Sequence, residues 1–151
     1  MGIHMDADVR REIGEHGAAA YPHECCGALL GVAGPDKVVV RLLRIDNARD
    51  RAHARNRFLV TDDDYRQAEH AADRAGLDLL GFYHSHPDHP ARPSRYDLDH
   101  AFPSFSYVIV AIESGEPGTI TSWVLAENRD RFEEESITGA ELSARGDREW
   151  R

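Results

Sequence analysis

Four histidines and three aspartates lie within residues 81–101, which read GFYHSHPDHPARPSRYDLDHA. His84 and His86 are separated by one residue at the end of an apolar run, and side chains two apart on a β-strand project from the same face. Two imidazoles on one face can both reach a zinc ion at about 2.0–2.1 Å. A carboxylate from a following short helix, Asp97 or Asp99, can supply a third ligand.

Three nitrogen and oxygen ligands leave one position for water, which is the pattern of a catalytic zinc site rather than a structural one. Zinc lowers the pKa of bound water to about 7 and polarises a carbonyl group, so such a site can hydrolyse an amide. The same segment is also compatible with a histidine-containing polar turn that binds no metal, since prolines and aspartates are typical turn residues. Spacing alone leaves both interpretations open.

Hydrophobic patterns predict the elements that must position these residues. Helices are expected at 6–21, at 62–76 with Thr61 as N-cap and Gly76 at the end, and as a short helix at 94–101 capped by Ser94. Strands are expected at 25–34 and 37–45 as one hairpin, at 57–60, at 77–86, and at 106–114 and 119–127 as a second hairpin across 115–118. Residues 46–56 are expected to form a loop. The result is one α/β domain with about six or seven strands and two main helices.

Composition excludes several classes of function. The chain has 18 basic and 27 acidic residues, a net charge of −9 and a single lysine, Lys37, so nucleic acid is not an expected partner. No run of apolar residues is long enough to span a membrane, and the N-terminal segment lacks the features of a secretory signal. The adjacent Cys25 and Cys26 do not form a secreted disulfide framework and are expected to be buried on a strand. We therefore expect a cytoplasmic globular protein.

The motif His84-Ser85-His86-Pro87, followed by Ser94 and Asp97, resembles the signature of the JAMM (MPN-plus) zinc metallopeptidases. That signature is H-x-H followed, after ten residues, by an aspartate, and the family also carries a glutamate on an earlier segment. Glu24, in YPHECCGALLG, lies in the matching context. The resemblance covers residues 5–127, with a charged tail at 128–151, and implies a single JAMM domain over residues 1–151. The implied fold is a mixed β-sheet flanked by two main helices, in the MPN/JAMM (cytidine-deaminase-like) architecture.

The resemblance also implies roles for individual residues. His84, His86 and Asp97 would be the ligands of one Zn²⁺ per chain, and Glu24 would be the general base that moves a proton from water to the leaving amine. Ser94 would help to hold the oxyanion of the tetrahedral intermediate. Without the resemblance, Glu24 has no claim to catalysis, and Ser94 is sufficiently explained as a helix N-cap.

The family hydrolyses amide bonds, including isopeptide bonds, after the C-terminus of ubiquitin-like proteins. The motif sequences are most similar to those of the compact prokaryotic peptidases that act on sulfur-carrier proteins. The resemblance therefore implies a partner with a Gly-Gly C-terminus and neither nucleic acid nor membrane. Two alternatives stay open: a catalytically silent scaffold on the same fold, and a zinc hydrolase of small amide conjugates. The sequence does not set the oligomeric state.

Overall fold

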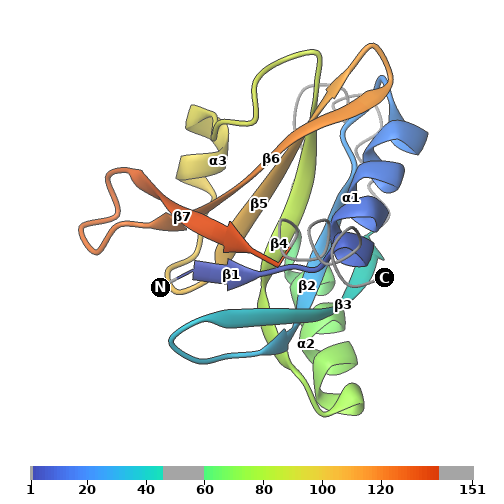
Figure 1. The fold of residues 1–151 in the computed structure, drawn as a ribbon. Coiled ribbons are helices and arrows are strands. Elements are labelled where there is room, and N and C mark those ends of the chain that lie inside the picture. Colours follow the sequence, from blue (N-terminus) through green and yellow to red (C-terminus); the bar gives the residue numbers. More distant parts are fainter. Residues whose placement is uncertain (1, 46–59, 140–151) are drawn as a thin grey trace.

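The computed structural model describes residues 2–45 and 60–139 (Figure 1). Within these residues the elements are β1 (Gly2–His4), α1 (Ala7–Ala20), β2 (Cys26–Val32), β3 (Lys37–Ile45), α2 (Asp62–Ala75), β4 (Asp78–Pro87), α3 (Arg95–Asp99), β5 (Ser106–Glu113), β6 (Glu116–Leu125) and β7 (Phe132–Thr138). The predicted loop at 46–56, most of the predicted strand at 57–60 and the end of the predicted tail lie outside the described residues. None of the described helices combines the length and the apolar character that crossing a membrane requires.

The strands form a mixed sheet in the order β1-β3-β2-β4-β5-β6-β7, and the sheet closes into a barrel. Closure is made by β1, which pairs in parallel with β3 on one side and with β7 on the other. The mixed sheet in one α/β domain is confirmed, but the prediction did not include closure. The more specific likeness to the cytidine deaminase architecture stays a prediction.

The two main helices cover opposite faces of the central strands β2, β4 and β5. On one face, Ile13 of α1 belongs to a buried cluster that includes Tyr83 of β4. On the other face, Ala68 and Ala72 of α2 belong to a second cluster that includes Phe82, the neighbour of Tyr83 on the same strand. Figure 1 shows α1 and α2 as separate layers beside these strands. Both faces of β4 are therefore buried, which explains its long apolar run.

Local capping fixes where α2 begins and ends. The Thr61 side chain accepts a hydrogen bond from the Asp64 backbone N–H, and the Asp64 side chain accepts one from the Thr61 N–H. This reciprocal pair satisfies two donors that a helix start otherwise leaves unpaired. Gly76 follows in the left-handed conformation at φ 70°, which suits glycine because it has no Cβ. The predicted bounds, cap and terminator of this helix are confirmed.

Two strands were not predicted. The structure places β1 at Gly2–His4, where no strand was predicted. It also places β7 at Phe132–Thr138, inside the segment expected to be a charged tail, so this part of the tail is a strand of the barrel although its side chains are mostly exposed. β7 has no run of buried apolar residues, and it is held partly by Glu135, which accepts hydrogen bonds from Ser106 and Ser122 at 2.5 and 2.8 Å.

The hairpin between β5 and β6 is also tighter than predicted. β5 ends at Glu113 and β6 begins at Glu116, so the turn consists of Ser114 and Gly115 instead of residues 115–118. Both turn residues have positive φ, at 51° and 88°. Two-residue hairpins favour this geometry because its twist matches that of the flanking strands.

Candidate metal centre

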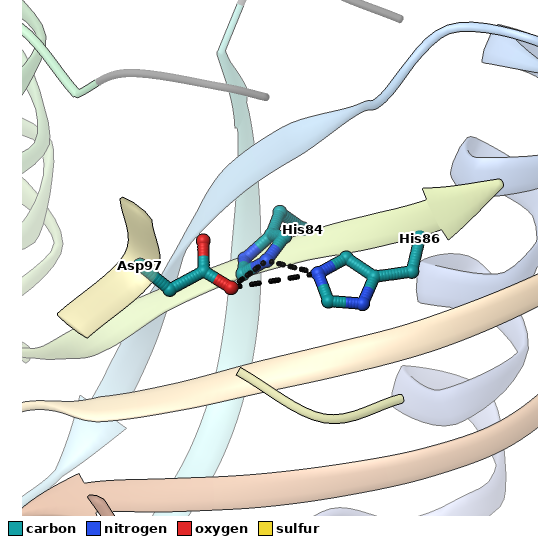
Figure 2. Close-up of side chains that lie close together, drawn as sticks. All are labelled: His84, His86 and Asp97. Atoms are coloured by element: carbon teal, nitrogen blue, oxygen red, sulfur yellow. Dashed lines mark hydrogen bonds and ion pairs between the residues drawn. The ribbon is translucent and has the colours of Figure 1, made fainter. Parts of the chain in front are cut away.

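His84 and His86 project from the same face of β4, as their spacing predicts. Their neighbours on β5, in the register of the parallel ladder, are Ile109 and Ala111. Both histidines are almost completely buried, at 1% and 2% exposure. They continue the face of Phe82, so the row of apolar side chains along β4 changes to imidazoles at the carboxyl end of the strand. Figure 2 shows the two rings side by side over this strand.

Asp97 reaches the histidines from α3, the short helix that follows. A capping box fixes the first turn of this helix: the Ser94 hydroxyl oxygen accepts from the Asp97 N–H at 3.0 Å, and Asp97 Oδ2 accepts from the Ser94 N–H at 2.8 Å. The cap orients the carboxylate toward β4, and Figure 2 shows it pointing at both imidazoles. The sequence left Asp97 and Asp99 as options for the third ligand, and the structure brings Asp97 to the cluster.

The three ligand atoms form a nearly equilateral triangle. The Nε2 atoms of His84 and His86 lie 3.1 Å apart, and Asp97 Oδ2 lies 3.3 Å from the first and 3.5 Å from the second. Two ligands of a tetrahedral zinc at about 2.0–2.1 Å are separated by about 3.3–3.4 Å. The cluster therefore has the dimensions and the donor types of a zinc site with three protein ligands. Within the described part of the chain, no second group of this kind occurs.

The protonation states also suit a metal. Burial of Asp97 acts to raise the pKa of its carboxyl group, but the His84 charge and hydrogen bonds from His84, His86 and the Ser94 backbone lower the pKa well below its usual range. Burial lowers the pKa of His84, against the opposing effect of Asp97. Metal ligands of this kind are a carboxylate and neutral imidazoles, and the two shifts favour a carboxylate at Asp97 and a neutral imidazole at His84.

His86 has a further partner that holds its ring. Its Nδ1 atom lies 2.8 Å from the carbonyl oxygen of Pro90, which can only accept a hydrogen bond. Nδ1 therefore carries a proton, and in the neutral imidazole the lone pair of Nε2 faces the cluster. Nothing in the sequence pattern indicates this contact, because it depends on how the chain turns after β4.

Glu24 lies just before β2 and is buried, at 4% exposure. Cys26 is the antiparallel partner of His84, and the Ser85 N–H donates to the Cys25 carbonyl. The antiparallel register, extended by one residue beyond the Cys25–Ser85 pair, leads from Glu24 toward His86. A glutamate before a strand is usually solvated, so the burial of Glu24 is a feature that the sequence pattern alone did not indicate.

The other polar residues of the motif lie around the cluster. Ser94 is exposed at the start of α3, and its hydroxyl hydrogen is available to donate while its oxygen caps the helix. His89 is exposed and stacks on His86, with ring centroids 4.2 Å apart. Asp99 pairs with Arg95 on the surface. His89 and Asp99 therefore both lie at the surface beside the cluster.

Ser85 was not identified as a functional residue, although it lies between the two histidines in sequence. It projects from the opposite face of β4 and is fully buried. Its hydroxyl oxygen accepts a hydrogen bond from the Cys25 N–H at 2.8 Å. Together with the backbone bond from Ser85 N to Cys25 O at 3.2 Å, this contact fixes the segment that carries Glu24.

Cys25 and Cys26 are both free thiols and both buried, as expected. Burial is the main cause that raises the pKa of the Cys25 thiol to about 11. A thiol in this state is a poor nucleophile at neutral pH, because only the thiolate reacts. The structure therefore gives no support to cysteine chemistry at this site.

The sequence and the fold of this chain are matched by known proteins. Residues 6–126 match the family described as prokaryotic homologs of the JAB domain, and the chain belongs to that family. A desampylase from Haloferax volcanii is 32% identical over 112 residues, which are 71% of this chain and 78% of that protein.

Two solved structures show the same fold. A protein from Salinibacter ruber is 47% identical, with a TM-score of 0.71, and the match covers 92% of this chain and 91% of that one. A JAB1/MPN domain protein from Archaeoglobus fulgidus is 19% identical, with a TM-score of 0.57 over 93% of this chain and 99% of that one. The resemblance to the JAMM/MPN proteins that the motifs indicated is thereby confirmed.

Proposed function

We propose that this chain is a zinc metallopeptidase that hydrolyses the amide bond after the Gly-Gly C-terminus of a ubiquitin-like or sulfur-carrier protein. The observation that carries the proposal is the triangle of His84, His86 and Asp97, whose edges of 3.1–3.5 Å fit a tetrahedral zinc with one open position. The name of the Haloferax volcanii relative, a desampylase, implies a ubiquitin-like protein as the substrate of that enzyme and supports the same class of substrate here.

In this proposal His84, His86 and Asp97 hold one zinc ion. When bound, zinc supplies Lewis-acid polarisation and lowers the pKa of water at the open position. The hydrogen bond between His86 Nδ1 and the Pro90 carbonyl keeps the Nε2 lone pair directed at the cluster. The capping box between Ser94 and Asp97 keeps the Asp97 carboxylate directed at the cluster.

Glu24 is the proposed general base and then the general acid. Its carboxylate takes a proton from the attacking water and returns it to the nitrogen of the leaving group, so that the C–N bond breaks with an amine as product. Burial beside the histidines supports this role, because a carboxylate in a site of low solvent access exchanges protons with bound groups rather than with bulk water. Ser94 donates its hydroxyl hydrogen to the oxygen that becomes negative in the tetrahedral intermediate.

The first experiment is a measurement of metal content in the purified protein by elemental mass spectrometry, with His84→Ala as the control. We expect about one zinc per chain in the native protein and a loss of zinc in the variant. Absence of zinc after reconstitution, or equal zinc in both proteins, would contradict the proposal and favour the silent scaffold.

The second experiment separates a carrier-protein peptidase from a hydrolase of small conjugates. The zinc-loaded protein is incubated with a sulfur-carrier protein extended beyond Gly-Gly and, in parallel, with a short peptide amide that has the same sequence around the bond. Cleavage of the carrier at a much higher kcat/KM than the peptide is the expected result, because only the carrier offers a folded surface as well as its tail. Equal cleavage would favour the small-conjugate alternative.

A further inference from the structure

An apolar pocket opens directly beside the metal cluster. It has a volume of about 280 Å³, and His84 and Asp97 form part of its wall. Much of the remaining wall is aromatic, from Phe82, Tyr96, Phe102 and Tyr107. Sites for whole small-molecule ligands measure about 300–1,000 Å³. The volume of this pocket lies just below that range, and it is large enough to accept one bulky side chain.

The outer edge of the pocket is an exposed but fixed aromatic ring. Phe102 is 45% exposed, although large apolar residues are usually covered. Its backbone N–H donates to the Tyr107 hydroxyl at 2.7 Å, and its ring centroid lies 6.0 Å from that of Tyr65 and 6.3 Å from that of Phe105. An apolar side chain that is exposed and held rigid beside a cavity is typical of a preformed binding surface.

Several polar groups in the wall are already engaged, whereas Arg129 in the same wall remains a cation that an acidic group could approach. The Tyr107 hydroxyl accepts from Phe102, Asp97 faces the two histidines, and Asp99 Oδ1 accepts from Arg95 at 3.1 Å. A polar side chain that enters would lose its hydration and find these groups occupied, which is unfavourable. An apolar side chain gains about 25 cal/mol for each Å² of apolar surface that it buries. The chemistry of the wall therefore selects an apolar occupant.

The place of the pocket also restricts which substrate residue can enter it. Because two cluster residues line the pocket, its occupant belongs to a residue next to the hydrolysed bond. An extended peptide advances about 3.3 Å per residue, so side chains before the two glycines lie about 7–10 Å away. The glycines themselves have no side chain. The remaining candidate is the residue that follows Gly-Gly and carries the released amine.

We propose that this pocket binds a bulky apolar side chain on the residue immediately after Gly-Gly, and so makes the protein selective for the group that it releases. The inference rests on the proposed peptidase function and adds a preference within it. Arg129 also lines the pocket, so an acidic residue at the same position is the strongest competitor.

The test uses one sulfur-carrier protein extended beyond Gly-Gly by a single Phe, Leu, Ala or Asp, with the zinc-loaded full chain as enzyme. A substrate that fills an apolar pocket has a kcat/KM about 10–200-fold higher than one that leaves the pocket empty. We expect the Phe and Leu extensions to be cleaved that much faster than the Ala extension, and the Asp extension to be no better than Ala.

A variant connects the preference to the pocket. Phe102→Ala removes the exposed ring, and we expect it to reduce the ratio of Phe to Ala cleavage by at least about tenfold. Val40→Ala is the matched control, because Val40 is an equally exposed apolar residue at 53% on β3 and does not line the pocket. Binding of the Phe and Ala extensions to Glu24→Gln, measured by calorimetry, should show the same preference without turnover.

The outcomes distinguish this inference from the function on which it rests. Equal rates for all four extensions would overturn the pocket assignment and leave the peptidase function intact. A preference that follows the residue before Gly-Gly, tested with a matched pair of carriers, would also overturn it. If the zinc-loaded protein cleaves none of the extensions, the proposed function fails and the inference fails with it.

Discussion

The two faces of β4 have different tasks although their residues alternate along one strand. Phe82, His84 and His86 face α2 and the metal cluster, whereas Tyr83 and Ser85 face α1. All five side chains are nearly or completely buried, so exposure does not distinguish the two sets. The difference lies in their partners. His84 and His86 direct ligand atoms at a shared point, whereas Tyr83 and Ser85 make hydrogen bonds that join neighbouring elements.

This contrast shows how a strand can separate chemistry from stability. Tyr83 crosses β2 over Gly27, where an added Cβ would lie 2.2 Å from the ring, and its hydroxyl meets His16 of α1 at 2.7 Å. Replacements on that face should change the free energy of unfolding and leave the metal unaffected. Replacements of the histidines on the other face should reduce metal binding and leave the free energy of unfolding nearly unchanged. Ser85 is the exception, because it touches the segment that carries Glu24.

The largest effect is expected for Asp97→Ala, which removes a ligand from the chemical face. Loss of a group that merely supports a ligand costs about 10–100-fold in metal affinity, and loss of a ligand should cost more, with activity lost together with zinc. Asp99→Ala is the matched control, since Asp99 is exposed and pairs with Arg95. Zinc at full occupancy in Asp97→Ala, measured by elemental mass spectrometry, would remove Asp97 from the ligand set.

The next largest effect is expected for Glu24→Gln. The amide keeps the shape of the side chain but cannot accept the proton from water, so kcat should fall by about 10²–10⁴-fold while zinc stays bound. Parallel measurements of zinc content and of carrier cleavage separate this effect from loss of the metal. A variant with full zinc and unchanged kcat would show that Glu24 is not the base.

Ser85→Ala tests whether the two faces of β4 are truly independent. It leaves the buried Cys25 N–H without its acceptor, which should cost about 1–3 kcal/mol of unfolding free energy. Displacement of the Glu24 segment should also lower kcat by about 10–100-fold, with zinc content unchanged. Ser85→Thr keeps the hydroxyl and should recover most of the rate.

A double-mutant cycle decides whether Ser85 acts through Glu24. If Ser85 is a positioning residue, Ser85→Ala should have little further effect on kcat when Glu24 is already glutamine. If the two effects simply multiply, Ser85 stabilises the fold without positioning the base, and the separation between the faces is complete.

Tyr83→Phe should affect only stability. It removes the hydroxyl that meets His16 and should lower the unfolding free energy by about 1 kcal/mol, as measured by urea denaturation. Zinc content and carrier cleavage should match those of the native protein. A loss of zinc in this variant would show that the α1 face transmits changes to the ligands.

Near neutral pH, the smallest effect is a dependence of stability on pH through His16. Burial, with a smaller effect of Arg44, lowers the pKa of His16 from 6.5 to about 4. The unfolded chain therefore binds a proton that the native state does not, and stability is lost as pH falls from about 6.5 toward 4. In His16→Gln, unfolding free energies at pH 7, 6 and 5 should fall less steeply than in the native protein. Parallel curves for the two proteins would contradict this assignment.

Much of the fold could be predicted because its signals are local. The N-cap at Thr61, the terminator Gly76 and the apolar run of β4 are encoded within a few residues of where they act. β1 and β7 could not be predicted in the same way. β1 has three residues, and β7 is held by pairing and by hydrogen bonds to Glu135 from strands distant in sequence, without an apolar pattern of its own.

The sequence by itself determined that a pair of imidazoles would share one face of a strand and that a capped helix would follow with a carboxylate. Strand alternation and helix capping are short-range rules, so they fix such features before the chain folds. Only the tertiary structure decided that Asp97 rather than Asp99 reaches the histidines, that Glu24 is buried, and that Phe102 stands at the edge of an apolar pocket. Each of these depends on the distance between elements far apart in sequence, which the packing of α2, α3 and the barrel strands sets.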